Sequence, residues 1–277
     1  MTTLYVSDLD GTLFNSKKRI SDYSAQVLNK CIDKGMLFTV ATARMPYGCD
    51  TRLAAIRLDN PGILTNGVFL YNFATQSYAG VEAMDRESVP AVREAFKKKG
   101  LSCFLYTFRN DKINIYFEDE AMRGQTQYYS DRALESCGEV LCVPDSLAKT
   151  ENAQTFYAAL TGSEADLRPV RDSLAEIPGI ACALYLNIYN GLYCLEAFSA
   201  KASKKNALAK LKDILHYDEL VVFGDNHNDI SMIEVADRSY APENALAEVK
   251  ERVTAVLESS DDDGVAKFLA AEMNIVI

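Results

Sequence analysis

The chain has 277 residues, of which 48% are hydrophobic and 25% are charged, a balance typical of a globular protein with a buried core. Its formal charge is −10 and no basic run offsets it, so we expect no nucleic-acid partner, because such binding needs many phosphate-neutralising Lys and Arg. No apolar stretch is long enough to cross a bilayer and no signal-peptide pattern opens the chain, so we expect a cytoplasmic protein without a membrane partner.

The first part of the chain alternates strands with helices. Ser21 is the expected N-cap of the first helix, and Gly35 is its expected stop. Strand–helix alternation predicts a parallel sheet with right-handed crossovers. Strands are expected over residues 3–8, 36–42 and 62–67, and helices over 21–35 and 46–58.

The middle of the chain contains a helix followed by a hairpin, twice. The second hairpin turns at Asn190-Gly191, which is a strong hairpin signal between alternating apolar runs. Antiparallel hairpins within a parallel pattern indicate an inserted α+β domain over residues 81–198, with 1–80 and 199–277 forming the other domain. The helices are expected over 89–100 and 164–179, and the strands over 101–108, 112–119, 180–189 and 192–198.

The alternating pattern returns after the insertion. Ser203 is expected to cap a helix that ends at Leu215. The insertion is therefore expected to lie between two halves of one α/β sheet. Further strands are expected over 219–225 and 238–242, and helices over 228–236, 244–253 and 264–273.

Polar residues gather where the expected parallel strands end. In open parallel sheets ligands bind beyond the carboxyl ends of the strands, so these residues are expected at one rim. The first strand delivers two acids that should repel each other unless a cation lies between them. The candidate residues are Asp8, Asp10, Gly11, Thr42, Arg44, Asn66, Lys204, Asp225, Asn228 and Asp229.

Three of the acids favour a metal site. Asp8, Asp10 and Asp225 would give an oxygen-rich site of the kind that Mg²⁺ prefers, and the ion would remove the repulsion between the carboxylates. Magnesium held by few carboxylates usually keeps waters and takes a substrate phosphate oxygen. This interpretation points to a phosphorylated small molecule as the partner.

The other polar residues favour phosphoryl chemistry. Thr42 and Lys204 would form a phosphate cradle from one hydroxyl and one ammonium, aided by backbone N–H groups where the chain turns at Gly11. Asp8 ends the rigid strand and is the better-placed nucleophile, which would form an aspartyl-phosphate. Asp10 could protonate the leaving oxygen and then activate water.

Each position also has an ordinary structural interpretation, as a turn, a cap or a surface ion pair. Their joint placement at one rim is harder to attribute to turns. These ordinary interpretations apply to Asp10, Gly11, Thr42, Arg44, Asn66, Lys204, Asp225 and Asp229.

Five segments resemble motifs of the haloacid dehalogenase superfamily, specifically its Cof-type phosphatases with a large α/β cap. The segments are "DLDGT", "VATAR", "TNGV", "SKKNAL" and "GDNHNDISM", which run from residue 8 to residue 232 in the family's order. The resemblance implies a Rossmann-like parallel-sheet core, an inserted mobile α+β cap domain, and Mg²⁺-dependent hydrolysis of phosphate monoesters of small metabolites, such as sugar phosphates.

The resemblance also implies roles for individual residues. Asp8 would be the nucleophile and Asp10 the general acid/base. Mg²⁺ would be held by Asp8, the backbone carbonyl of Asp10 and Asp225, with Asp229 orienting its waters. Phosphate would be bound by Thr42, Lys204 and Asn228, with Gly11, Arg44 and Asn66 near the site. Ala43, Lys201 and Lys205 depart from the glycines that are common at these family positions.

Two alternatives stay open at this point. A sugar phosphomutase would transfer the phosphoryl group between sugar positions rather than to water. A non-catalytic phosphometabolite-binding protein would retain the fold, but we would then expect one of Asp8, Asp10, Lys204 or Asp225 to be lost, and all four are present. The sequence identifies neither the particular substrate nor the oligomeric state.

Overall fold

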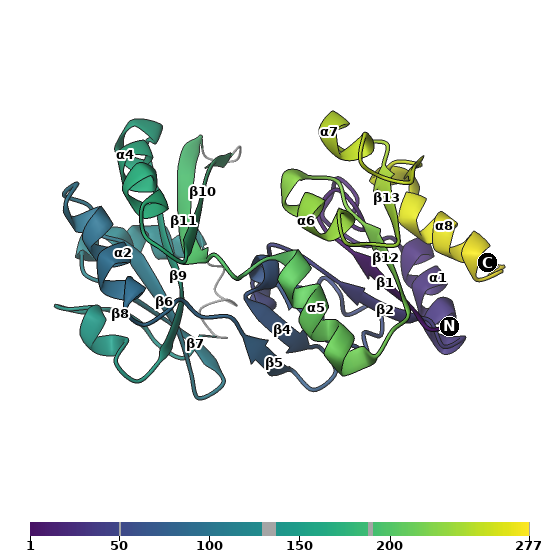
Figure 1. Cartoon of the computed structure of the whole chain (residues 1–277), viewed down its shortest axis with the longest axis horizontal. Helices are drawn as coiled ribbons and strands as arrows, with labels where there is room; N and C mark the ends of the chain where they lie inside the picture. The colour runs from purple at the N-terminus through teal and green to yellow at the C-terminus, as the bar shows by residue number, and fades with distance from the viewer. Residues whose placement is uncertain (50, 129–136, 188–190, 277) are drawn as a thin grey trace. The chain divides into compact units, whose positions relative to one another are not determined.

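The computed structural model describes residues 1–49, 51–128, 137–187 and 191–276. Its contacts divide the chain into two compact units, Met1–Gly80 with Ser203–Ile277 and Val81–Ala202 (Figure 1). The domain ranges expected from the sequence, 1–80 with 199–277 and 81–198, stay a prediction. None of the helices in the described part of the chain combines the length and the apolar character that a bilayer crossing requires.

The first unit is built on a parallel sheet, as predicted. The strand order is β14-β13-β12-β1-β2, so β1 lies in the middle between β12 and β2. Ser7, the last residue of β1, is paired with Phe223 on one side and with Val40 on the other. The strands are β1 (Thr3–Ser7), β2 (Leu37–Val40), β12 (Glu219–Phe223), β13 (Arg238–Pro242) and β14 (Ala255–Leu257).

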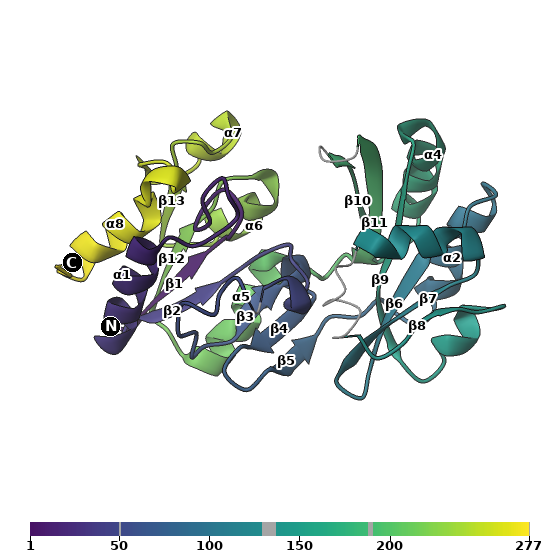
Figure 2. The same ribbon diagram turned by 180° about the vertical axis from the view of Figure 1, so that it is seen from behind.

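Helices cover both faces of this sheet. Both predicted N-caps are confirmed, because the Ser21 hydroxyl accepts from the Ser24 N–H and the Ser203 hydroxyl accepts from the Asn206 N–H. Figure 2 shows α1 and α8 lying together on one face. The helices are α1 (Asp22–Asp33), α5 (Lys204–Leu215), α6 (Ile230–Ile233), α7 (Ala247–Lys250) and α8 (Gly264–Glu272).

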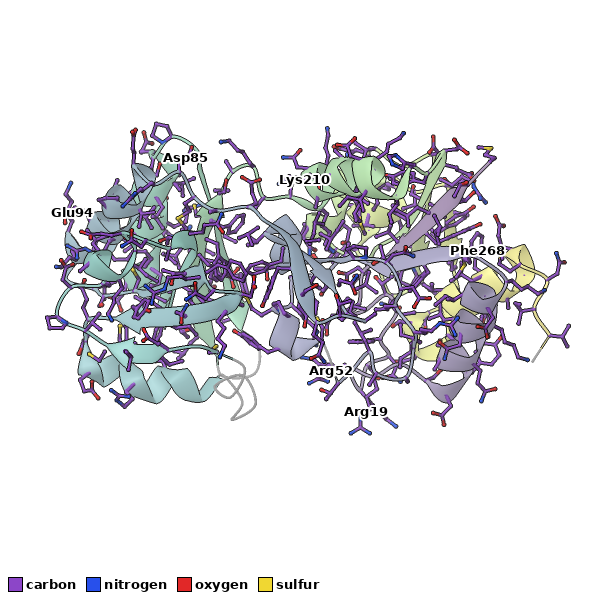
Figure 3. All side chains as sticks on the ribbon, turned by 90° about the horizontal axis from the view of Figure 1, so that it is seen from below. Arg19, Arg52, Asp85, Glu94, Lys210 and Phe268 are labelled. Carbon is purple, nitrogen blue, oxygen red and sulfur yellow. The ribbon has the colours of Figure 1, made fainter. Side chains whose placement is uncertain are left out.

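Alternate residues of the strands supply the two halves of the core. Leu4 and Val222 pack with Leu208 of α5 on one face. On the other face Phe223 lies 5.6 Å from Phe268 of α8, measured between ring centroids. Figure 3 labels Phe268 on α8 and Lys210 on the exposed side of α5. A sheet that is buried on both faces is rigid, so the residues directly after its strands are held in fixed positions.

A small antiparallel sheet, β3-β4-β5, continues the first unit. A single parallel bridge between Ala41 and Ile63 joins β3 to the edge of the main sheet. The sequence pattern predicts β3 but not the two strands that follow. Their bounds are β3 (Gly62–Leu64), β4 (Phe69–Asn72) and β5 (Ser77–Val81).

The helix predicted over residues 46–58 is wrong. The described residues of this segment form only a short 3-10 turn, Pro46–Gly48, followed by other turns. Cys49, Leu53 and Ile56 have helical spacing and are all buried, but successive turns bury them instead of a helix. Gly48 is the third residue of this segment, and a glycine at such a position lowers helix stability.

The inserted unit is an α+β domain, as predicted. Its sheet has the order β10-β11-β9-β6-β7-β8, in which every pair is antiparallel except β7 with β8. The two predicted helix–hairpin units are confirmed, although Asn190 of the second turn lies outside the described residues. The elements are α2 (Ser88–Lys97), β6 (Phe104–Arg109), β7 (Lys112–Phe117), β8 (Val140–Cys142), β9 (Gln154–Gly162), α4 (Glu164–Ala175), β10 (Ile180–Asn187) and β11 (Leu192–Ser199).

Asn110 and Asp111 form the β6–β7 turn with φ of 54° and 56°, the left-handed pair that a two-residue hairpin loop requires.

Short 3-10 helices connect several elements of both units. The remaining 3-10 helices are Thr65–Gly67, Glu120–Tyr128, Leu147–Lys149, His227–Asp229 and Ser260–Asp262.

Candidate active site

Asp8 follows β1, an inner strand of the parallel sheet, and is held in line with it. Its backbone N–H donates to the carbonyl oxygen of Phe223 at 2.9 Å, which extends the β1–β12 ladder by one residue. The Ser7 hydroxyl donates to the Asp8 carbonyl oxygen at 2.7 Å. The Asp8 side chain is only 8% exposed, so this carboxylate is fixed and largely removed from water.

Lys204 is the cation that faces Asp8. It is the first residue of α5, directly after the Ser203 cap, and its side chain is fully buried. Its Nζ donates to Asp8 Oδ1 at 2.6 Å and to Asp229 Oδ1 at 2.5 Å. One buried ammonium therefore joins two acids that are more than two hundred residues apart in sequence.

Asp229 also shapes the loop that carries Asp225. Its Oδ2 accepts from the backbone N–H of Asp225 at 2.8 Å and from that of Asn226 at 3.0 Å. Gly224 permits this approach, because a Cβ there would lie 2.5 Å from the Cβ of Asp229. Both Asp229 oxygens thus hold other parts of the site in place.

Asp225 is bound to the turn that follows Asp10. The Thr12 hydroxyl donates to Asp225 Oδ1 at 3.0 Å. Gly11 has φ of +80°, and a Cβ at this position would lie 2.5 Å from Asp225 Oδ2, so only glycine fits. Thr12 was missed as a site residue, although it stands in the quoted "DLDGT" segment.

The three acids form one cluster. Asp8, Asp225 and Asp229 each offer an oxygen, and these oxygens lie within 4.8 Å of one another. Carboxylate oxygens at this spacing fit a hard divalent cation such as Mg²⁺. The Asp10 carboxylate instead accepts from Arg44, with Nε at 2.6 Å from Oδ2 and Nη2 at 2.5 Å from Oδ1.

Two acids of this cluster, Asp8 and Asp225, lie in surroundings that disfavour their charged form. Burial raises the pKa of Asp8 well above its usual range, and the neighbouring carboxylates raise it further, despite the opposing effect of Lys204. Burial and Asp229 raise the pKa of Asp225 to about 6, although the Thr12 hydroxyl opposes them. Burial lowers the pKa of Lys204, but Asp229 and Asp8 outweigh it and raise that pKa to about 12, so the ammonium stays charged.

The expected phosphate-binding residues lie at the same edge of the sheet. Thr42 follows β2, is 1% exposed, and its hydroxyl accepts from the Arg44 N–H at 3.2 Å. The Asn66 N–H donates to the Thr42 carbonyl oxygen at 3.0 Å. Asn228 Nδ2 donates to Asn66 Oδ1 at 3.1 Å. A chain of contacts thus joins β2, the turn after β3 and the Asp225 loop.

Asn244 is a second residue that the sequence analysis missed. It follows β13 and its Nδ2 donates to the carbonyl oxygen of Gly11 at 2.7 Å. The placement of polar residues after strands could have found it, because Asn244 comes two residues after the predicted strand 238–242.

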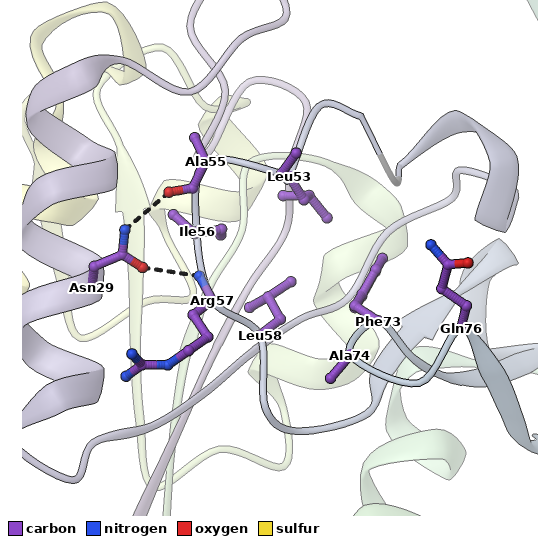
Figure 4. A pocket seen from close by; sticks show the side chains of 10 residues that line it. Asn29, Leu53, Ala55, Ile56, Arg57, Leu58, Phe73, Ala74 and Gln76 are labelled. Atoms are coloured by element: carbon purple, nitrogen blue, oxygen red, sulfur yellow. Dashed lines mark hydrogen bonds between the residues drawn. The ribbon is translucent and has the colours of Figure 1, made fainter.

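The first unit also contains a cavity of about 680 Å³ away from the acidic cluster (Figure 4). It is bordered by the last turns of α1, the segment 53–58 and the turn after β4. None of its lining residues belongs to the candidate site. Its only charged lining residue, Arg57, pairs with Asp33 and Asp59, so the cavity lacks the chemistry that the acidic cluster offers.

A parallel α/β sheet with buried acids and a lysine beyond its inner strand β1, and an α+β domain inserted in the chain, fits the class of phosphoryl-transfer hydrolases. Residues 5–269 match the family described as haloacid dehalogenase-like hydrolase, and the chain belongs to this family. It is a phosphatase of the haloacid dehalogenase type, and its inserted unit is the cap domain.

Curated relatives support the same class. The chain is 28% identical to the 5-amino-6-(5-phospho-D-ribitylamino)uracil phosphatase YwtE of Bacillus subtilis (strain 168) over 281 residues, which cover 95% of each protein. It is 24% identical to the pyridoxal phosphate phosphatase YbhA of Escherichia coli (strain K12), over 99% of this chain and 100% of that protein.

Solved structures share the fold. A haloacid dehalogenase-like hydrolase from Bacteroides thetaiotaomicron superposes with a TM-score of 0.77 at 23% identity, over 98% of this chain and 100% of the other. The subclass IIB sugar phosphatase BT4131 superposes with a TM-score of 0.71 at 20% identity, over the full length of both chains. The Rossmann-like core with an inserted α+β cap domain is therefore the fold of this chain.

Proposed function

We propose that this protein hydrolyses phosphate monoesters of small metabolites in a Mg²⁺-dependent reaction, with Asp8 as the nucleophile. One observation carries the proposal: Asp8 is fixed beyond the inner strand β1, its Oδ1 accepts from the buried Lys204 ammonium, and Asp225 and Asp229 complete an acidic cluster around it. A carboxylate with a raised pKa in a buried cluster is typical of a functional group rather than a structural one.

The chemistry assigned to the acids takes two steps. An Asp8 oxygen attacks phosphorus, the bond from phosphorus to the ester oxygen breaks, and Asp10 delivers a proton to the leaving oxygen. The ionised Asp10 then takes a proton from a water that attacks the aspartyl-phosphate, which releases phosphate and restores Asp8. In the structure the Asp10 carboxylate pairs with Arg44, so proton transfer requires Asp10 to leave that ion pair.

The proposed phosphate contacts come from Thr42, Lys204 and Asn228. The Lys204 ammonium is fixed by Asp8 and Asp229, so its charge is already oriented before substrate binds. Thr42 offers a buried hydroxyl and Asn228 an amide at the same sheet edge. Gly11, Arg44 and Asn66 are assigned to the surroundings of the site.

Asp8, the backbone carbonyl of Asp10 and Asp225 would hold Mg²⁺, which supplies charge neutralisation for the acids and the phosphoryl oxygens. Asp229 would act by holding Lys204 and by orienting metal-bound water, because both of its oxygens already accept protein hydrogen bonds. The donor set contains only oxygens, which is the set that suits Mg²⁺.

The test is hydrolysis of p-nitrophenyl phosphate with Mg²⁺ by the wild type and by Asp8→Asn. We expect the variant to lose activity by about 10⁴-fold or more, because the nucleophile is removed. Asp213→Asn, which changes an exposed acid of α5, is the matched control and should retain wild-type turnover. Turnover by Asp8→Asn would exclude Asp8 as the nucleophile.

A panel of phosphorylated metabolites would identify the substrate. The names of the similar proteins suggest phosphorylated ribitylaminouracil, pyridoxal phosphate and sugar phosphates as its first members. Free phosphate as the product supports hydrolysis, whereas an isomeric sugar phosphate would indicate a mutase. A bound ligand that survives long incubation with Mg²⁺ would indicate a non-catalytic binding protein.

A further inference from the structure

Asn244 joins two distant parts of the chain at the carboxyl edge of the parallel sheet. Its Nδ2 donates to the carbonyl oxygen of Gly11 at 2.7 Å, and its Oδ1 accepts from the backbone N–H of Ser260 at 2.8 Å. The two partners fix the orientation of the amide, because a carbonyl only accepts and an N–H only donates. The side chain therefore cross-links the turn after Asp10 to the segment before α8.

The Gly11 end of this cross-link lies directly beside the acidic cluster. Gly11 approaches Asp225 so closely that no side chain fits between them, and the next residue, Thr12, donates to Asp225 Oδ1. A shift of the Gly11 peptide would therefore move the carbonyl of Asp10 on one side and the Thr12 hydroxyl on the other. Gly11 is therefore the residue at which the first acidic loop, the turn after β1 that carries Asp10, contacts Asp225.

The loop of Asn244 also binds the second acidic loop, which follows β12 and carries Asp225. Leu246, two residues further along, donates its backbone N–H to the carbonyl oxygen of Asp225 at 3.0 Å. One short segment between β13 and α7 thus contacts both loops that carry the proposed metal ligands.

The Ser260 end is firmly anchored. Asp261 Oδ1 accepts from the Ser16 N–H at 2.7 Å, and Asp263 Oδ1 accepts from the hydroxyls of Ser21 at 2.5 Å and Ser24 at 2.7 Å. The turn that holds Asn244 therefore also holds the chain between the Asp10 turn and α1. This gives the amide of Asn244 a fixed support from which to hold Gly11.

We propose that Asn244 is a positioning residue of the phosphatase site, which acts through Gly11 to keep the Asp10 carbonyl and the Asp225 carboxylate placed for a divalent cation. The inference rests on the proposed function. Because Asn244 acts through the cation ligands, its loss should weaken metal binding and lower kcat at limiting Mg²⁺, with little change in KM for substrate.

The experiment measures Mn²⁺ binding to the full-length protein by electron paramagnetic resonance, with Mn²⁺ as the probe for the Mg²⁺ site. We expect Asn244→Ala to raise the Mn²⁺ dissociation constant about threefold to tenfold, which matches the loss of one hydrogen bond. Its kcat for p-nitrophenyl phosphate should fall at limiting Mg²⁺ and recover as Mg²⁺ is raised, a recovery that general destabilisation would not produce.

Asn29 provides a matched control in the same unit. Its Nδ2 donates to the Ala55 carbonyl oxygen at 2.9 Å and its Oδ1 accepts from the Arg57 N–H at 2.9 Å, beside the cavity of Figure 4. Asn29→Ala removes the same kind of double backbone contact away from the acids and should leave the Mn²⁺ dissociation constant unchanged. Wild-type Mn²⁺ affinity in Asn244→Ala, or an equal loss of affinity in Asn29→Ala, would overturn the inference.

The outcomes also separate this inference from the proposed function. Wild-type protein that releases no phosphate with Mg²⁺ would refute the function, and turnover by Asp8→Asn would refute Asp8 as the nucleophile, whatever Asn244→Ala does. An inactive Asp8→Asn together with unchanged Mn²⁺ binding in Asn244→Ala would leave the function intact and refute the positioning role alone.

Discussion

Two carboxylates with little exposure, one in each unit, have opposite electrostatic surroundings. Burial raises the pKa of each, but for Glu118 in the cap domain the Ser146 N–H and hydroxyl, with Arg93 and Lys97, outweigh burial and leave its pKa below the usual value. For Asp8 burial wins, because two further carboxylates oppose the single ammonium of Lys204. A carboxylate whose hydrogen bonds are satisfied stabilises a fold, whereas a strained one is available for a cation and for chemistry.

The largest expected effect on stability comes from removing the one cation of the acidic cluster. Lys204→Ala leaves Asp8 and Asp229 buried without their shared partner, so we expect the free energy of unfolding to fall by about 3–5 kcal/mol. Urea denaturation of the metal-free protein measures it. Lys205→Ala, at the exposed next position of α5, should change stability by less than about 0.5 kcal/mol. Equal effects of the two substitutions would contradict the role given to Lys204.

The strain around Asp8 and Asp225 should make stability depend on Mg²⁺. At a Mg²⁺ concentration about a hundred times its dissociation constant, the ion should add about 2.7 kcal/mol to the free energy of unfolding, and chelation should remove it. Asp225→Asn should lose most of this gain, because one proposed ligand is weakened. Thermal denaturation with Mg²⁺ and with EDTA measures both. If the melting temperature of the wild type is the same with Mg²⁺ and with EDTA, the proposed metal site is wrong.

A smaller effect is expected for the satisfied acid of the cap domain. Glu118→Gln should lower the stability of that domain by about 1–3 kcal/mol at neutral pH, because charged hydrogen bonds to Arg93 and Ser146 are weakened. The pKa of Glu118 is lower in the folded state, so its contribution is present above the unfolded pKa and is lost as the pH falls through the folded pKa. Hydrogen exchange of cap-domain amides should therefore differ between variant and wild type at pH 7 and converge once the pH falls below the folded pKa of Glu118. Glu118→Gln should retain the phosphatase activity of the wild type, whereas Asp8→Asn should lose it.

The sequence was most informative where a residue acts through its place after a strand. Asp8, Thr42 and Asp225 each follow a parallel strand, so the rule for strand ends was enough to expect them at one edge. The caps Ser21 and Ser203 were likewise readable, because capping is local. Asn244 obeys the same rule, because it follows β13 by two residues.

Features that depend on distant contacts were not readable. The pairing of Asp10 with Arg44 and the hydrogen bond of Thr12 to Asp225 are made by side chains whose partners are set by the fold. The segment 46–58 has apolar residues at helical spacing, yet successive turns bury these residues without a helix. β9 was missed because its run of small and apolar residues lacks a clear alternation, and only its place in the middle of the cap sheet shows it to be a strand.

The inserted cap domain has a consequence for synthesis on the ribosome. β1, which ends directly before Asp8, pairs with β12, and β12 follows the insertion in sequence, whereas Val81–Ala202 is continuous. Chains emerge from the ribosome amino end first, and domains fold as units. The cap can therefore fold before β12, β13 and β14, which complete the sheet of β1, have been synthesised. The nascent enzyme would thus remain inert until Ser203–Ile277, about its last quarter, has left the exit tunnel.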